Sequence, residues 1–204
     1  GFAKYWMHNG YLLSEGEKMS KSLGNFYTIN ELLREYPGEA IRLLLLKTHY
    51  RQPLDFSKSG LDEAKRELDR FYRALREVTA DTNGENLDVG VSDALNDDLN
   101  TPLALSVLHA KLRYLNNSNG EQRNAAAVDL RRAAKVLGLL EQNPEDWFRW
   151  APPDQAALDD EQIKLLIVRR SEARAKKDFA ESDRIRNELI DAGIILEDKP
   201  DGTI

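Results

Sequence analysis

Apolar residues recur every three or four positions through most of the chain, which is the spacing of one face of an α-helix. Three stripes of this kind would each cover about four or five turns. They run through Leu61, Ala64, Leu68, Phe71, Leu75 and Val78, through Leu99, Leu103, Val107 and Leu115, and through Ala126, Leu130, Ala133, Leu137 and Leu140. Such helices bury their apolar faces against one another, so the pattern predicts a mainly α protein in which residues 28–142 form an antiparallel helical bundle.

Residues with strong capping preferences indicate where these helices begin and end. Thr28 and Glu31 have the spacing of a capping box, and Pro37-Gly38 interrupts the helical pattern that follows. The continuous run from Leu43 to Leu46 then predicts a helix that is buried on nearly all sides. Asn100-Thr101-Pro102 suits a helix entry, because Pro fits the first turn.

The first residues, "GFAKYWMHNGYLL", are aromatic and apolar and do not follow the helical spacing. Asn9 and Gly10 both tolerate the positive φ of a tight hairpin turn, so we predict strands within residues 3–13 that are joined there. Such strands need a partner sheet, and nothing in the chain precedes them to supply it. The sequence therefore indicates a fragment of a larger protein.

The last quarter of the chain begins with a different composition. Three of the seven prolines and two tryptophans, Trp147 and Trp150, lie close together, which suggests a docked linker and a boundary near residue 151. Beyond it, apolar spacing predicts a helical pair that ends at Gly193, with a short hairpin around residues 200–202. The residues that mark the pair are Ile163, Leu166, Ile167, Phe179, Ile185 and Leu189.

Composition narrows the class of protein. The 204 residues include no Cys, and the formal charge is −6, from 29 Lys and Arg against 35 Asp and Glu. No disulfide framework is possible, and no apolar run approaches the roughly 18 residues that span a membrane. We therefore expect a soluble, cytoplasmic protein with no membrane partner, whose contacts with polyanions depend on local clusters of Lys and Arg.

The segment "GEKMSKSLGN", residues 16–25, contains the most specific chemistry of the chain. Two ammonium groups three residues apart, those of Lys18 and Lys21, repel each other unless a dense anion lies beside them. A nucleotide polyphosphate is such an anion, and the hydroxyls of Ser20 and Ser22 can donate to its oxygens. The pattern points to electrostatic stabilisation of a departing phosphate, although charge alone fits a solvated basic turn about equally well.

The pentapeptide at residues 18–22 resembles the signature of class I aminoacyl-tRNA synthetases, and a specified string of this length occurs by chance about once in ten thousand such chains. Its surroundings narrow the resemblance to the cysteinyl-tRNA synthetase family, in that family's order. The similar segments are "YWMHNGYLLSEGEKMSKSLGNFYTINELL", "EAIRLLLLKTHYRQPLDFS", "ALNDDLNTPLAL" and "ARAKKDFAESDRIRNELIDAGIILEDKPDGT".

The resemblance covers nearly the whole chain and implies the C-terminal portion of such an enzyme. Residues 1–27 would end the class I nucleotide-binding catalytic domain, residues 28–150 would form the DALR-type bundle, and residues 151–204 an anticodon-binding module. "EAIR" at residues 39–42 departs mildly from the signature of that bundle. The implied enzyme activates cysteine with ATP and transfers it to tRNA(Cys), and we expect a monomer.

The family's motif assigns roles to individual residues of the loop. Lys21 matches the lysine that binds ATP and the leaving phosphates, and Lys18 would assist it as the second catalytic residue. Ser20 and Ser22 match further ATP-binding positions. Met19 would anchor the loop by packing beneath it.

Other parts of the family's active site are absent from this sequence. These are a His-containing tetrapeptide and the ligands of the zinc ion that the family uses to select cysteine, so the chain alone is expected to be inactive. His8, His49 and His109 share no metal-ligand spacing, and we interpret them as structural or surface residues. We predict no metal site in this chain.

A second basic cluster lies between residues 164 and 187, with eight Lys or Arg against four acids. Arg170, Arg174 and Lys177 are spaced to share one helix face, which could follow a phosphate backbone or form a solvated surface crossed by salt bridges. The resemblance favours the first and implies tRNA binding. Trp147 and Trp150 are either base-stacking residues or, as we prefer, packing residues of the linker.

Two other functions fit parts of these observations. The cysteine ligase of mycothiol synthesis shares the loop and its chemistry, but it needs no anticodon-binding module, so residues 173–203 disfavour it. A helical RNA-binding module without catalysis is the other alternative. Binding of tRNA by the chain would exclude the cysteine ligase of mycothiol synthesis and favour the implied synthetase.

Overall fold

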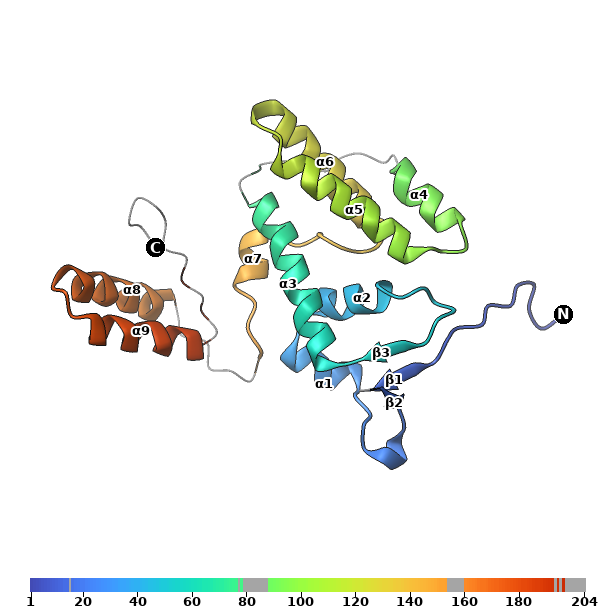
Figure 1. Ribbon diagram of the computed structural model, residues 1–204, viewed down its shortest axis with the longest axis horizontal. Helices are drawn as coiled ribbons and strands as arrows, with labels where there is room; N and C mark the ends of the chain where they lie inside the picture. The colour runs from blue at the N-terminus through green and yellow to red at the C-terminus, as the bar shows by residue number, and fades with distance from the viewer. Residues whose placement is uncertain are drawn as a thin grey trace. The chain divides into compact units, whose positions relative to one another are not determined.

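The computed structural model describes residues 1–14, 16–76, 78, 88–153, 160–192, 194 and 196. Contacts divide the chain into two compact units, Gly1–Trp150 and Ala151–Ile204. The described part is mainly α, as the periodicity predicts (Figure 1). The first unit contains β1 (Leu12–Ser14), β2 (Glu17–Lys18), the 3-10 helix η1 (Lys21–Leu23), α1 (Ile29–Glu35), α2 (Gly38–Leu46), β3 (Leu54–Phe56), α3 (Lys58–Leu75), α4 (Val89–Asn96), α5 (Thr101–Asn116), α6 (Gly120–Lys135) and α7 (Pro144–Phe148); the second contains α8 (Asp160–Ala175) and α9 (Phe179–Asp191).

A small sheet of order β2-β1-β3 opens the first unit. β1 pairs antiparallel with β2, with Leu13 opposite Lys18, and parallel with β3, with Leu12 opposite Leu54. A parallel pair needs a long crossover connection, which the segment containing α1 and α2 supplies. The sheet thereby places the segment with the two lysines beside the start of the helical part.

The predicted hairpin at Asn9-Gly10 is wrong. The N–H of Gly10 donates to the carbonyl of Tyr50 at 2.7 Å, and a Cβ on Gly10 would lie 2.3 Å from the carbonyl oxygen of Gln52. Gly10 is therefore the residue that lets two backbone segments approach closely, and the chain continues to Leu12, where the first strand begins. A glycine signal in a sequence does not distinguish this role from a turn.

The predicted boundaries of the first helices are confirmed. The side chain of Thr28 accepts from the N–H of Glu31, and the carboxylate of Glu31 accepts from the N–H of Thr28, which completes the capping box of α1. Pro37 is the N-cap of α2. In α2 Leu43 and Leu44 are buried, but Leu45 is 42% exposed, so this helix has an outer face that the run of leucines concealed.

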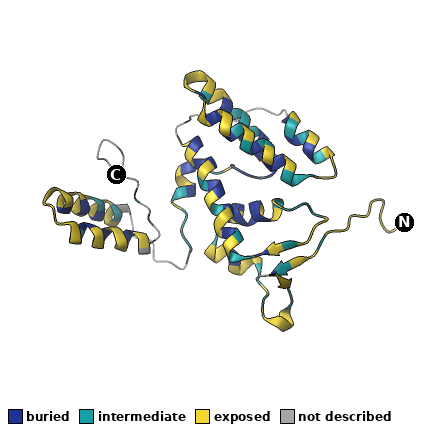
Figure 2. Cartoon of the chain, in the orientation of Figure 1, coloured by how far each residue is buried: buried dark blue, intermediate teal, exposed yellow. Residues whose placement is uncertain are grey.

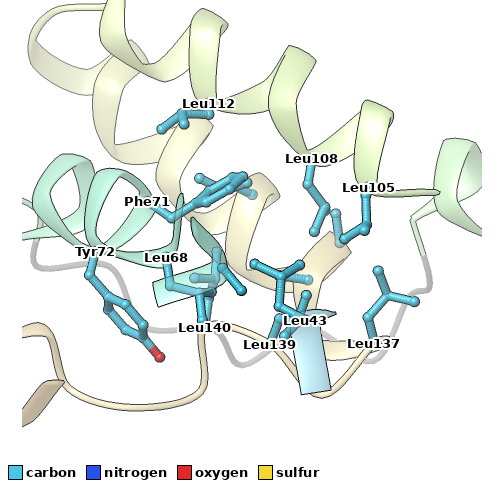
Figure 3. Packing of buried hydrophobic residues seen from close by; sticks show 14 of the residues in the cluster. Leu43, Leu68, Phe71, Tyr72, Leu105, Leu108, Leu112, Leu137, Leu139 and Leu140 are labelled. Atoms are coloured by element: carbon cyan, nitrogen blue, oxygen red, sulfur yellow. The ribbon is translucent and has the colours of Figure 1, made fainter. Parts of the chain in front are cut away.

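The core of the first unit lies among α2, α3, α5, α6 and the segment after α6 (Figure 3). The stripe predicted for α3 is buried from Leu61 to Leu75, whereas Val78 lies beyond the helix and is half-buried. The stripe predicted for α6 is buried as well, including Leu137 and Leu140 in the segment that follows. Figure 2 shows the resulting alternation of buried and exposed faces along these helices.

The stripe predicted for α5 is only partly correct. Leu115 is buried and Val107 is half-buried against the core, as predicted, but Leu99 and Leu103 are 45% and 46% exposed. The helix also buries Ala104, Leu105, Leu108 and Leu112, which the predicted stripe omitted. The helical pattern breaks between α4 and α5, where Asp98 and Leu99 have φ values of 50° and 54°. Because the turn rotates the following helix, a pattern that is counted from before the break misplaces the buried face at the start of the helix.

The carboxylate of Glu39 joins three parts of this core. It accepts hydrogen bonds from the hydroxyl of Tyr72 at 2.6 Å, from the N–H of Leu140 and from the side-chain amide of Gln142. Burial raises the pKa of Glu39, and these hydrogen bonds offset part of the rise. Glu39 therefore ties α2 to α3 and to the segment after α6.

A second buried carboxylate, Glu67 on α3, lies between the ammonium group of Lys47 and the imidazole of His109. Its oxygens are 3.1 Å from Lys47 Nζ and 2.7 Å from His109 Nε2. Burial acts to raise the pKa of Glu67, but the bonds from His109 and Lys47 outweigh burial and hold the pKa below its ordinary value of 4.5. Such a group adds stability above its unfolded-state pKa, and this stability is lost as the pH falls through the folded-state pKa.

We predict that the free energy of unfolding falls as the pH is lowered below about 4.5, and that the fall is smaller in Glu67→Gln, because the amide does not titrate. Asp129, whose bonds to Lys111 and Arg132 outweigh its burial and lower its pKa, would retain part of the fall. Glu39 acts with the opposite sign, since its raised pKa favours the folded state at low pH. Urea unfolding at a series of pH values, followed by tryptophan fluorescence, measures the free energy of unfolding. If this free energy fell equally with pH in Glu67→Gln and in the wild type, the prediction would be contradicted.

The second unit is a helical pair with its own small core. Leu166, Ile185 and Leu189 are buried, and Ile194 and Leu196 pack against them. Phe179 was expected to join this core but is 64% exposed, because it is the first residue of α9 and precedes the buried stripe. The predicted cap at Gly193 and the hairpin around residues 200–202 lie outside the described residues.

Candidate functional sites

Glycines turn the backbone at both ends of the lysine-containing segment. Gly16 and Gly24 have φ values of 81° and 67°, in the left-handed region, and a Cβ on either would meet no atom within 4 Å. The conformation, and not crowding, therefore requires glycine at these positions. The N–H of Gly16 also donates to Asp55 Oδ1 on β3 at 2.9 Å, which ties the segment to the sheet.

The side chain of Asn25 closes the loop on itself. Its Oδ1 accepts from the N–H of Ser20 at 2.9 Å, and its Nδ2 donates to the carbonyl of Lys18 at 3.3 Å. A single amide therefore bridges the two halves of the lysine-containing motif. The sequence analysis missed this role, although an Asn that follows a Gly in a loop is a recognised turn-forming signal.

The loop presents Lys18 and Lys21 to solvent, since both side chains are exposed. Among the described residues neither lysine forms an ion pair, and Lys21 Nζ lies 5.8 Å from the centroid of the Phe26 ring. The hydroxyls of Ser20 and Ser22 are 3.2 Å apart on the same turn. Two cations and two hydroxyls are thus available to an anion without first breaking an ion pair in the described structure.

Met19 anchors the middle of this motif, as predicted. Its N–H donates to the carbonyl of Leu12 on β1 at 3.4 Å, and its half-buried side chain packs against the core of the first unit. Lys18 and Lys21 therefore flank a residue that is held against the sheet and the core. The arrangement suits electrostatic stabilisation of a polyphosphate, for which charge and position are the whole requirement.

The second candidate site is arranged differently from the prediction. Arg170 is only 4% exposed, so its guanidinium does not face a ligand in solution, whereas Arg174 is exposed. Lys177 is also exposed, but α8 ends at Ala175, and Lys177 lies in the following turn with a φ of 59°. The three residues therefore do not share one exposed helix face, because the helix ends before the spacing of the sequence is completed.

The tryptophan of the predicted linker is a core residue. Trp147 is 1% exposed, its ring stacks on Tyr72 with centroids 4.6 Å apart, and its Nε1 donates to Asp69 at 2.7 Å. The packing interpretation is therefore confirmed for Trp147. Trp150 is half-buried.

Two of the histidines take part in structural contacts. These are His109, which contacts Glu67, and His49, whose Nε2 lies 2.9 Å from the carbonyl oxygen of Asp98. The third histidine, His8, is exposed and stacks near Trp6. Within the described ranges no three His, Cys, Asp or Glu residues are grouped so that they could hold a metal ion.

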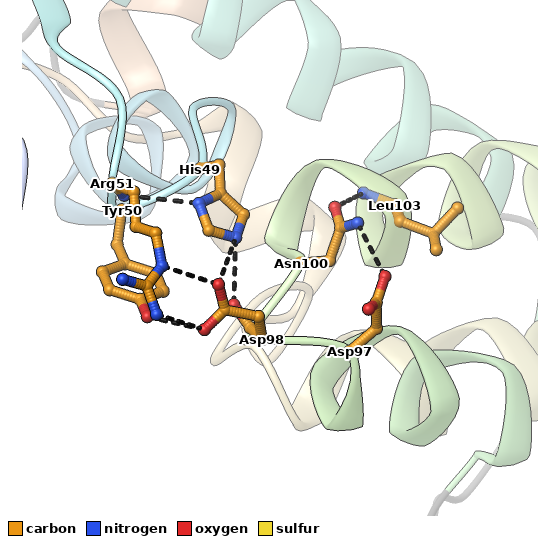
Figure 4. Close-up of polar contacts among 7 residues, drawn as sticks. All are labelled: His49, Tyr50, Arg51, Asp97, Asp98, Asn100 and Leu103. Carbon is orange, nitrogen blue, oxygen red and sulfur yellow. Dashed lines mark hydrogen bonds and ion pairs between the residues drawn. The ribbon is translucent and has the colours of Figure 1, made fainter. Parts of the chain in front are cut away.

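A polar cluster that the sequence analysis missed surrounds Asp98 (Figure 4). Arg51 donates to its two carboxylate oxygens at 2.7 and 3.0 Å, and the hydroxyl of Tyr50 donates at 2.7 Å. The bond from Arg51, followed by that from Tyr50, holds the pKa of Asp98 far below its ordinary value. The cluster fastens the loop before β3 to the strained turn between α4 and α5, and consecutive His-Tyr-Arg residues were the only signal for it.

No helix within the described residues has both the length and the apolar composition to cross a membrane.

Three family models match successive parts of the chain. The tRNA synthetases class I (C) catalytic domain matches residues 1–66, the DALR domain matches residues 90–141, and the cysteinyl-tRNA ligase anticodon binding domain matches residues 157–203. Together they cover both candidate sites.

Curated relatives match the chain from end to end. A cysteine–tRNA ligase of Rhodospirillum centenum is 51% identical over 201 residues, which are 98% of this chain and 44% of that protein. Those of Rhodospirillum rubrum and Paramagnetospirillum magneticum are 48% and 49% identical over 99% of this chain, and 44% and 45% of their own lengths are covered. The chain therefore spans less than half the length of the relatives it matches.

Proposed function

We infer that the chain belongs to the cysteine–tRNA ligases and corresponds to their C-terminal region, because three of their domain models match it in order. The parent protein would activate cysteine with ATP and transfer it to tRNA(Cys) in the cytoplasm, acting as a monomer. Residues 1–27 would complete the catalytic domain, residues 28–150 the DALR-type bundle, and residues 151–204 the anticodon-binding module. Alone, the chain would bind tRNA without catalysing aminoacylation.

The loop of residues 16–25 would bind the phosphates of ATP. Lys21 would neutralise the pyrophosphate as it leaves, Lys18 would hold the adjoining phosphate charge, and Ser20 and Ser22 would donate hydrogen bonds to phosphate oxygens. The observation that carries this proposal is the exposure of both lysines, neither of them in an ion pair within the described residues. Asn25 and Met19 would position these groups without touching the nucleotide.

The second unit would contribute to tRNA binding through exposed cations at one end of its helical pair. Arg174 and Lys177 meet this requirement because both are exposed. Arg170 would act from beneath them by supporting α8, since its side chain is buried. We therefore propose Arg174 and Lys177 as phosphate contacts and Arg170 as a positioning residue.

Binding of tRNA(Cys) to the chain, measured by fluorescence anisotropy of the labelled RNA, tests this function. We expect saturable binding that weakens with salt. Arg174→Gln combined with Lys177→Gln should make the negative slope of log affinity against log salt shallower by about 1.4 to 1.8. A control with the same change of charge replaces the exposed Arg113 and Lys135 of the first unit by Gln. Absence of binding by the wild-type chain would refute the proposed tRNA partner, and equal slopes would refute the two contacts.

A further inference from the structure

The outer face of α3 carries a row of arginines that the proposed function does not use. Arg66, Arg70 and Arg73 are spaced four and three residues apart, so they lie on one face of the helix, and all three are exposed. They line an open cavity of about 520 Å³ together with Lys47, Glu63, Glu67 and Asp69. We refer to Arg66, Arg70 and Arg73 as the α3 arginine row.

The carboxylates beside the row are already engaged by other groups. Glu67 contacts Lys47 and His109, and Asp69 accepts from Lys65 at 3.0 Å and from Trp147 Nε1 at 2.7 Å. Within the described part of the chain, Arg66 and Arg70 form no ion pair, and the same holds for the exposed Glu63. The cavity therefore presents an excess of positive charge, although the chain as a whole is negative.

The row projects from a rigid support. The opposite face of α3 is buried in the core of the first unit, where Leu61 and Leu68 are 0% and 1% exposed. The guanidinium of Arg73 lies 5.9 Å from the centroid of the Phe148 ring of α7. Along the helix axis the arginines are separated by about 6 Å and 4.5 Å. Such spacing lets neighbouring guanidinium groups reach neighbouring phosphates of one nucleic-acid strand, whose charges lie a few ångströms apart.

We propose that the α3 arginine row binds the sugar-phosphate backbone of tRNA at a site separate from the second unit. The planar guanidinium donates two parallel hydrogen bonds to a phosphate, and this favours an RNA backbone. Every residue that lines the cavity is charged, so it offers no apolar pocket for the side chains of a protein partner. The choice of tRNA rests on the proposed function; the phosphate chemistry rests on the row itself.

The test compares two double variants of the chain with equal changes of charge. Arg66→Gln combined with Arg70→Gln removes the two arginines that form no ion pair and keeps good helix formers on α3. Arg113→Gln combined with Lys135→Gln removes two exposed cations from α5 and α6. Labelled tRNA(Cys) is titrated with each protein over a range of salt concentrations, and urea unfolding verifies that both variants remain folded.

We expect the α3 variant to bind tRNA more weakly than wild type, with the negative slope of log affinity against log salt made shallower by about 1.4 to 1.8, and the control to keep the wild-type slope. Equal loss in both variants would overturn the proposal, because it would reflect net charge alone. Wild-type affinity in the α3 variant would also overturn it, and would leave tRNA binding by the second unit intact. Failure of the wild-type chain to bind tRNA would overturn this proposal together with the tRNA partner itself.

Discussion

We expect Lys21→Ala in the complete parent protein to lower the rate of cysteine-dependent pyrophosphate exchange by about two orders of magnitude, which corresponds to the loss of about 3 kcal/mol of transition-state stabilisation. The ammonium group is exposed, and the loop that carries it is fixed by Asn25 and Met19. Its removal should therefore delete one charge and leave the loop in place. The affinity for tRNA(Cys) should stay nearly unchanged, since the proposed RNA contacts lie on α3 and in the second unit.

Lys135→Ala is the control for this experiment, because it removes another exposed lysine, which lies on α6. An unchanged exchange rate in Lys21→Ala would refute the role proposed for Lys21. If exchange and tRNA affinity fell together, Lys21 would act through the structure of the protein and not through the departing phosphate. Only a selective loss of exchange supports the proposal.

The sequence predicted those features that depend on neighbouring residues. The capping box of Thr28 and Glu31 is complete within four positions, and the buried stripe of α3 lies within one uninterrupted helix. Both signals arise from local geometry, and no distant contact alters them. The lysine-containing motif was found for the same reason, because its chemistry is contained in five consecutive residues.

Features that depend on distant residues were missed or misread. Gly10 resembled a turn residue, yet its role depends on Gln52, more than forty positions away. The exposure of Leu99 and Leu103, which were predicted to be buried, follows from the left-handed turn at Asp98 and Leu99, which side chains from the loop before β3 hold in place. Arg170 was assigned to a surface because its charge gave no indication that its side chain is buried. In each case the missing information was a contact between segments.

The α3 arginine row and the Asp98 cluster show why the candidate sites were only partly predictable. The row has helical spacing in the sequence, but four acids within the same helix conceal its net charge until their partners are known. Glu67 forms an ion pair with Lys47, the C-cap residue of α2, and contacts the imidazole of His109 on α5. The charge that remains at such a site after ion pairing can be recognised only from the tertiary structure.

We expect Trp147→Ala to lower the free energy of unfolding of the first unit by about 3 to 5 kcal/mol, the usual cost of truncating a fully buried aromatic side chain. The substitution empties the space beside Tyr72 and removes the donor to Asp69. Urea unfolding followed by far-UV circular dichroism measures the loss. Trp147→Phe should cost less, because it keeps most of the packing and deletes only the hydrogen bond and part of the ring.

Trp150→Ala is the matched control, since this neighbouring tryptophan is only half-buried and should cost less than Trp147→Ala. The same variants separate packing from base stacking. If Trp147 is a core residue, the folded Trp147→Phe variant binds tRNA with wild-type affinity, since α7 still docks on α3 and keeps the ring of Phe148 beneath Arg73. A stable Trp147→Ala protein with weakened tRNA binding would instead identify Trp147 as a residue that leaves the core to stack on RNA.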